Sequence, residues 1–150
     1  MSAYEKIDIR FSLDIEPHAK GRPRYTGKGW AYTPLKTRVF EENFILLAEK
    51  YKPENRIEGP ICLHVTSIFS RPKRLMGRKH PKGLIFKTTK PDIDNVAKTV
   101  MDSLKGFWFD DNQVCSLFAA KYYAEIGGNS RIAIRLTRPI DIAGESSQDD

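Results

Sequence analysis

The segment KPDIDNVAKTVMDSLKGFWFDDNQV, residues 90–114, concentrates carboxylates in a chain of 150 residues whose net charge is +6. The acids are Asp92, Asp94, Asp102, Asp110 and Asp111. Carboxylates that converge repel one another unless a cation or a raised pKa offsets the repulsion. Their hard oxygens favour Mg²⁺, which binds through one or two carboxylates together with water and substrate phosphates. A metal ion held in this way can activate water for attack on a phosphodiester. The segment therefore predicts metal-dependent phosphoryl transfer.

A helix is expected to position the first three acids. Apolar residues recur at helical spacing and Gly106 follows as a C-terminal cap; they are Ile93, Val96, Ala97, Val100 and Leu104. At about 100° per residue one polar face collects Asp94, Asn95, Lys98 and Asp102. Ordinary surface ion pairs and a capping role for Asp94 would explain this face.

That ordinary interpretation does not explain Asp110 and Asp111, which follow the helix between FWF and NQV. A short glycine turn is expected to bring this pair back toward the helix. All five acids then become candidates for one site, with Lys98 placed four residues from both Asp94 and Asp102.

Two basic segments flank the chemistry. The loop EPHAKGRPRYTGKGWAY, residues 16–32, contributes Lys20, Arg22, Arg24 and Lys28. The second segment has no acid between residues 59 and 91 and contributes Arg71, Lys73, Arg74, Arg78 and Lys79. Both could be solvated surface loops. A basic stretch that leads directly into an aspartate cluster favours contact with nucleic-acid phosphates.

The remaining patterns indicate an α+β fold. IDIRFSLDI alternates as a half-buried strand. Thr33 is expected to be the N-cap and Pro34 the first residue of a helix that reaches about Tyr51. Its apolar side is expected to comprise Leu35, Val39, Phe40, Ile45 and Leu47. Residues 61–70 form a second strand, and two final strands are joined by a hairpin at IGGN. The order β-α-β-α-β-β predicts a mixed sheet flanked by helices.

Length and composition favour one domain over residues 1–140, followed by an acidic, disordered tail over residues 141–150. Without the tail the chain carries 25 basic and 15 acidic residues, a net charge of +10, which suggests a polyanionic partner. Cys62 and Cys115 are expected to be buried free thiols. Apolar runs are too short to cross a membrane and no signal peptide is recognisable. We therefore expect a cytoplasmic protein with no membrane association.

The segment PDIDNVAKTVMDSLKGFWFDDNQV resembles the RusA family of Holliday junction resolvases, as found in bacteria and their prophages. The resemblance rests on an Asp-x-Asp-Asn start, a lysine four residues after the second aspartate, and a closing Asp-Asp with Gln-Val. It implies a small homodimeric endonuclease that uses Mg²⁺, with Mn²⁺ as an alternative, and no nucleotide cofactor. Such an enzyme resolves four-way DNA junctions in recombination and repair by paired symmetric nicks.

By this match Asp92, Asp94 and Asp111 would be the metal-binding catalytic carboxylates and Lys98 the accompanying catalytic lysine. Asp110, Asn95 and Asp102 are supporting candidates. The dimer surface is expected either on the strand VCSLFAAKYYA or on the apolar remainder of the first helix. Two alternatives to a junction resolvase stay open at this point. One is a broader structure-specific nuclease that acts on forks or flaps, and the other is a non-catalytic DNA-binding protein on the same fold.

Overall fold

The computed structural model describes residues 4–20, 24–25, 27, 29 and 31–140. The six main elements follow the expected order: β1 (Asp8–Leu13), α1 (Leu35–Ala48), β4 (Ile61–Phe69), α2 (Ile93–Ser103), β6 (Val114–Tyr123) and β7 (Arg131–Thr137). Sequence patterns did not predict the short hairpin of β2 (Arg24–Tyr25) and β3 (Ala31–Tyr32), nor β5 (Ile85–Phe86). Four single-turn 3₁₀ helices complete the fold: η1 (Glu49–Tyr51), η2 (Lys73–Leu75), η3 (Lys105–Phe107) and η4 (Asp111–Gln113).

The main sheet has five strands in the order β1-β7-β4-β6-β5. β4 and β6 run parallel, whereas the pairs β1–β7, β4–β7 and β5–β6 are antiparallel. The sheet is therefore mixed, which confirms the predicted α+β class. The parallel pair requires a long crossover, and this connection contains the basic segment, β5 and α2.

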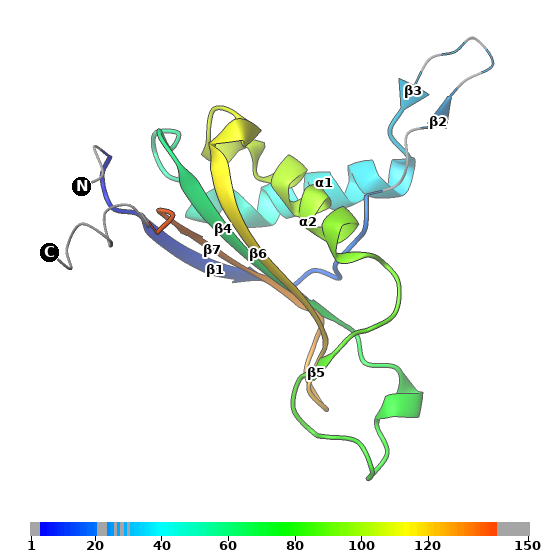
Figure 1. Cartoon of the computed structure of the whole chain (residues 1–150). Coiled ribbons are helices and arrows are strands. Elements are labelled where there is room, and N and C mark those ends of the chain that lie inside the picture. The colour runs from blue at the N-terminus through cyan, green and yellow to red at the C-terminus, as the bar shows by residue number, and fades with distance from the viewer. Residues whose placement is uncertain (1–3, 21–23, 26, 28, 30, 141–150) are drawn as a thin grey trace, which may run out of the picture.

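Both α-helices lie on one face of the sheet, and no helix of the described residues covers the opposite face (Figure 1). The core forms where α1 and α2 meet alternate residues of β1, β4 and β7, as the period of two in a strand requires. Its fully buried members include Phe44, Leu63, Val100, Ile132 and Leu136. On α2 the predicted apolar residues from Val96 to Leu104 are buried, while Ile93 is exposed.

The apolar side expected for α1 is largely wrong. Of the five residues proposed, only Phe40 is buried, and the core side of the helix is instead Thr37, Phe40, Phe44 and Ala48. These residues form a narrow stripe at steps of three and four, because α1 rests on the sheet along a single line of contact. The helix begins after Pro34, which is the N-cap rather than the first helical residue, and η1 continues it to Tyr51.

β6 leaves part of its outer edge without a partner strand. Beyond its pairing with β4, it pairs with β5 only at Tyr122 and Tyr123, so no described strand lies along Val114–Ala120 on that side. Leu117 and Phe118 on this stretch are 45% and 60% exposed. Cys62 is buried as expected, but Cys115 on the same edge is exposed, which corrects that prediction. An unpaired edge of this length is a template for pairing with another strand.

Candidate active site

Asp92 and Asp94 lie together at the N-terminal end of α2. Asp92 is the N-cap residue, but its side chain makes no capping hydrogen bond, and Asp94 follows in the first turn. Both side chains are exposed. The positive end of the helix dipole favours negative charge at this position. Capping therefore does not consume the Asp92 carboxylate, and both acids remain available to a ligand.

The two acids open onto a cavity of about 640 Å³, which we call the aspartate cavity. Its other walls come from β6, from β5 and from the residues that follow β5. The wall residues other than the two acids are Phe86, Lys87, Thr88, Ile93, Ala119, Ala120 and Lys121. Two aspartates and two lysines therefore line one cavity at the edge of the sheet.

A hydrogen-bonded cluster fixes the segment that leads into Asp92. Lys87 Nζ donates to Thr89 Oγ1 over 2.8 Å and to the Tyr123 hydroxyl over 3.2 Å. The hydroxyls of Thr89 and Tyr123 lie 3.0 Å apart. The hydrogen bond with Thr89, followed by the charge and hydrogen bond of Lys87, lowers the pKa of Tyr123 despite its burial. Sequence patterns missed this cluster, because strand and turn propensities carry no signal for it.

The polar face of α2 divides into two parts. Lys98 and Asn95 are exposed. Asp102 is only 11% exposed at its side chain and forms an ion pair with Lys20, with Lys105 Nζ at 3.9 Å from its other oxygen. Asp102 is therefore engaged by two cations from outside α2.

Lys20 ties the first basic segment to α2. Besides the ion pair with Asp102, its backbone N–H donates to the Asn95 carbonyl over 3.2 Å. The nearby Glu41 carboxyl has a raised pKa because of burial and the Asp102 charge. Arg22 and Lys28 lie outside the described residues, as does the side chain of Arg24, whose backbone belongs to β2.

Asp110 and Asp111 occupy a different cavity, of about 410 Å³, with Arg56 and Lys105 in its walls. Asp110 caps η4 by accepting from Asn112 N–H over 2.8 Å, and Gln113 completes this capping box. Asp111 Oδ1 accepts from the indole N–H of the buried Trp108 over 2.9 Å. The Asp110 carboxylate is thus used for capping, whereas Asp111 is exposed and only one of its two carboxylate oxygens accepts this hydrogen bond.

Within a single chain, Asp111 lies far from Asp92 and Asp94. The 11 residues of α2 rise about 16 Å, and Asp111 follows only after η3. Val114 and Lys121 are likewise separated by about 23 Å of strand, and Lys121 lines the aspartate cavity. Figure 1 shows the green segment entering one end of α2 and β6 beginning beyond the other. Within the part of the chain that the structure describes, no three acidic, histidine or cysteine side chains form a metal-binding group.

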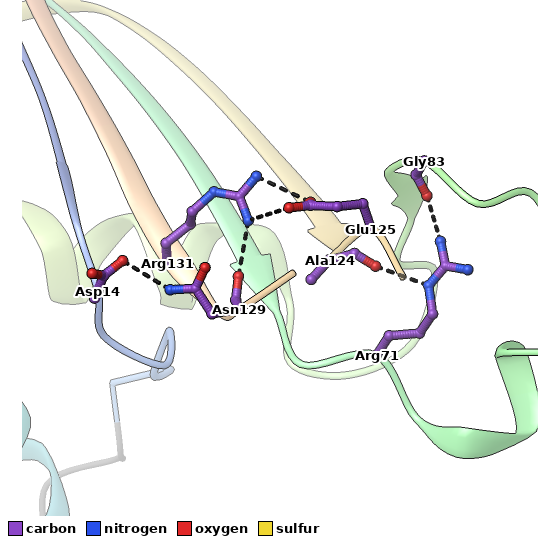
Figure 2. Close-up of polar contacts among 7 residues, drawn as sticks. All are labelled: Asp14, Arg71, Gly83, Ala124, Glu125, Asn129 and Arg131. Atoms are coloured by element: carbon purple, nitrogen blue, oxygen red, sulfur yellow. Dashed lines mark hydrogen bonds and ion pairs between the residues drawn. The ribbon is translucent and has the colours of Figure 1, made fainter. Parts of the chain in front are cut away.

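Arg71 anchors part of the second basic segment, residues 71–84, which we call the basic loop. The Arg71 side chain is buried, with 6% of the residue exposed. Its guanidinium donates to the carbonyls of Ala124 (2.8 Å), Leu75 (3.2 Å) and Pro81 (2.6 Å), and also to that of Gly83. Figure 2 shows two of these bonds. Arg71 is therefore engaged by backbone carbonyls, whereas the sequence pattern predicted a contact with DNA phosphates.

The other lysines and arginines of the basic loop are exposed, namely Lys73, Arg74, Arg78, Lys79 and Lys82. The loop rests on the turn between β6 and β7, where Arg131 pairs with Glu125 and Asn129 Nδ2 donates to Asp14 over 2.8 Å (Figure 2). The hydrogen bonds of Arg71 therefore fix the backbone from which the loop presents its charges.

No helix in the described part of the chain is long and apolar enough to cross a membrane.

A mixed α+β domain that combines paired exposed aspartates with exposed cations has the construction of a nuclease. Comparison with known proteins agrees. Residues 14–137 match the family model of endodeoxyribonuclease RusA, so the chain belongs to the RusA endodeoxyribonuclease family. It is also similar to the uncharacterized protein YqaN of Bacillus subtilis (strain 168). The two are 37% identical over 126 residues, which cover 78% of this chain and 89% of the relative.

Proposed function

We propose that the protein is a metal-dependent endonuclease that resolves four-way DNA junctions. The observation that carries this proposal is the pair of exposed carboxylates, Asp92 and Asp94, that share one cavity at the start of α2. Membership of the RusA family supplies the reaction class and implies the branched substrate. In a non-catalytic DNA-binding protein, carboxylates held close to phosphates would weaken DNA binding, because like charges repel.

The donor set suits Mg²⁺, or Mn²⁺ in its place. Asp92 and Asp94 offer hard oxygens, and a site of this kind needs only one or two carboxylates when water and substrate phosphate complete it. The bound ion would supply activation of water and stabilisation of charge on the phosphate oxygens. The role of the chain is to hold both acids at a helix terminus, to leave them free of capping bonds, and to place Lys98 one turn further along the exposed side of α2.

The two basic segments would bind the DNA backbone. Lys20 connects the first to Asn95, and residues 85–91 run from the basic loop into α2. In Figure 1 the β2–β3 hairpin and the basic loop project on either side of this end of α2. Exposed cations in such segments neutralise phosphates without reading sequence. Lys73, Arg74, Arg78 and Lys79 are our candidates, together with Arg22, Arg24 and Lys28.

We propose further that a second copy of the chain completes the site. Asp111 is apart from Asp92 within one chain, yet the motif that resembles the RusA family implies a catalytic role for both. If the free edges of two β6 strands paired antiparallel about Leu117, Val114 of one copy would lie opposite Ala120 of the other. The Asp111 end of each chain would then approach the aspartate cavity of its partner. The two-fold axis would also generate two such sites, as paired nicks require.

The exposed apolar residues of α1, such as Leu35 and Leu46, are the other candidate for a dimer surface. The β6 edge is preferred because it has both unpaired backbone groups and exposed Leu117 and Phe118, and because it accounts for the position of Asp111.

The test is cleavage of a synthetic four-way junction beside duplex, flap and fork controls, with Mg²⁺ or with EDTA. The proposal expects paired nicks at symmetric positions in the junction only when metal is present. Preferential cutting of flaps or forks would favour the broader structure-specific nuclease. Tight junction binding with no cleavage in Mg²⁺ or Mn²⁺ would favour a DNA-binding protein that retains the fold.

A further inference from the structure

Lys121 interrupts the apolar run of β6 and points its charge at the backbone beside the aspartates. Its ammonium donates to the Thr89 carbonyl over 2.8 Å and to the Pro91 carbonyl over 2.7 Å. Pro91 directly precedes Asp92, the N-cap of α2. The backbone carbonyl of Lys121 accepts a hydrogen bond from the Lys87 N–H over 3.1 Å. Lys121 therefore holds residues 87–91 at three points.

We infer that Lys121 is a positioning residue for the metal-binding carboxylates, an inference that rests on the proposed function. Charge-assisted hydrogen bonds are stronger and shorter than neutral ones, so two of them fix the carbonyls on either side of Lys90 firmly. The position of Asp92 follows from that of Pro91, because they share a peptide plane. Lys121 thereby sets where the Asp92 carboxylate enters the aspartate cavity.

The ammonium has a second consequence for the cavity. It has three N–H donors, and the two carbonyls take two of them. Lys121 also lines the cavity that contains Asp92 and Asp94. A fixed positive charge there reduces the repulsion between the two carboxylates before a metal ion binds and attracts the phosphate of an incoming strand. Both effects favour the same ligand geometry.

Three variants separate positioning from general stability. Lys121→Met removes the charge and the donors, Lys121→Arg retains both, and Lys121→Gln retains a donor without the charge. Lys6→Met is the control for loss of one positive charge, because Lys6 is exposed and lies before β1, outside the site. Thermal unfolding and junction affinity in Ca²⁺ establish that each variant is folded and binds DNA.

The first readout does not depend on activity. Hydrogen exchange at the Lys87 amide, which donates to the Lys121 carbonyl, should accelerate in Lys121→Met and not in Lys6→Met. Binding of Mn²⁺ to the protein without DNA, followed by electron paramagnetic resonance, should weaken about 10–100-fold, the usual effect of losing a group that orients metal ligands. Single-turnover cleavage should fall by a similar factor, while junction affinity stays within about threefold. Lys121→Arg should recover part of each loss.

Unchanged exchange and unchanged Mn²⁺ affinity in Lys121→Met would overturn the inference. A parallel fall of unfolding temperature, junction affinity and cleavage would also overturn it, since a purely structural residue predicts that result. If Lys121→Met does not fold, Lys121→Gln decides by the same criteria. Failure of the wild-type protein to cleave junctions would defeat the proposed function, whereas exchange and Mn²⁺ affinity would still decide the role of Lys121.

Discussion

At the scale of single residues, the structure separates aspartates that the sequence groups together. Asp102 pairs with Lys20 and Asp110 caps η4, so these two carboxylates have partners within the fold. Asp92 and Asp94 have no capping role through their side chains, and Asp111 uses one oxygen for Trp108. Spacing alone could not make this distinction, because each acid satisfies the same helical and turn patterns.

Replacement of Asp92, Asp94 or Asp111 by asparagine should therefore abolish cleavage and spare DNA binding. Loss of a metal ligand removes the chemistry, while loss of a negative charge reduces repulsion of phosphates. We expect at least about a 100-fold fall in single-turnover rate and equal or tighter junction binding in a gel-shift assay. Asp110→Asn is the matched comparison, and we expect it to retain most activity. A variant with full activity would exclude its residue from the site.

His18 gives the stability of the fold a predictable dependence on pH. Its ring nitrogen lies 3.0 Å from Thr37 Oγ1 and its ring packs against Phe40, while burial, aided by the charge of Lys36, lowers its pKa. The unfolded chain therefore binds a proton more readily than the folded chain. The stabilisation is complete above about pH 6.5 and is lost as pH falls through the lowered pKa.

Urea unfolding at about pH 7 and about pH 5.5 measures this effect. The free energy of unfolding should decrease toward the lower pH in the wild type, and less so in His18→Gln, which keeps a hydrogen-bonding side chain but does not titrate. Equal decreases in both proteins would assign the dependence to other groups.

Among the elements, both helices were predictable, but the buried side was predictable for α2 and not for α1. The apolar residues of α2 from Val96 onward recur strictly at helical spacing, so their burial followed from the pattern. On α1, apolar residues lie around much of the helix, so the pattern does not indicate which side is buried. The position of the sheet determines that Phe40 and Phe44 are buried. The hydrogen bonds of Lys121 and Arg71 were equally hidden, because their acceptors are backbone carbonyls distant in sequence.

Arg71 yields a prediction for the basic loop. Arg71→Met should destabilise the protein by about 3 kcal/mol, because it leaves buried carbonyls without their charged donor. It should also weaken junction binding, since the loop loses its fixed base. Arg78→Met serves as the comparison. It should leave stability unchanged and lower the slope of log affinity against log salt by about 0.9. A stable Arg71→Met protein with normal binding would contradict this role.

For the molecule as a whole, a site that combines Asp92, Asp94 and Asp111 requires two chains. Light scattering of the isolated protein should report about twice the 17.2 kDa chain mass. Leu117→Lys places a charge in the middle of the free β6 edge, which should oppose strand pairing and yield monomers. The monomers should remain folded and lose cleavage, because each would lack the Asp111 of a partner. A Leu117→Lys protein that remains a dimer would redirect the search to the exposed side of α1.

Mixing two inactive variants tests the shared site most directly. In a dimer of one Asp92→Asn chain and one Asp111→Asn chain, a site built from both chains would combine both substitutions on one side. The other side would have Asp92, Asp94 and Asp111 intact. We expect each variant alone to be inactive, and the mixture, after exchange of subunits, to nick one strand of a four-way junction. A mixture that contains the mixed dimer and remains inactive would show that each site belongs to one chain, and would contradict a site shared between two chains.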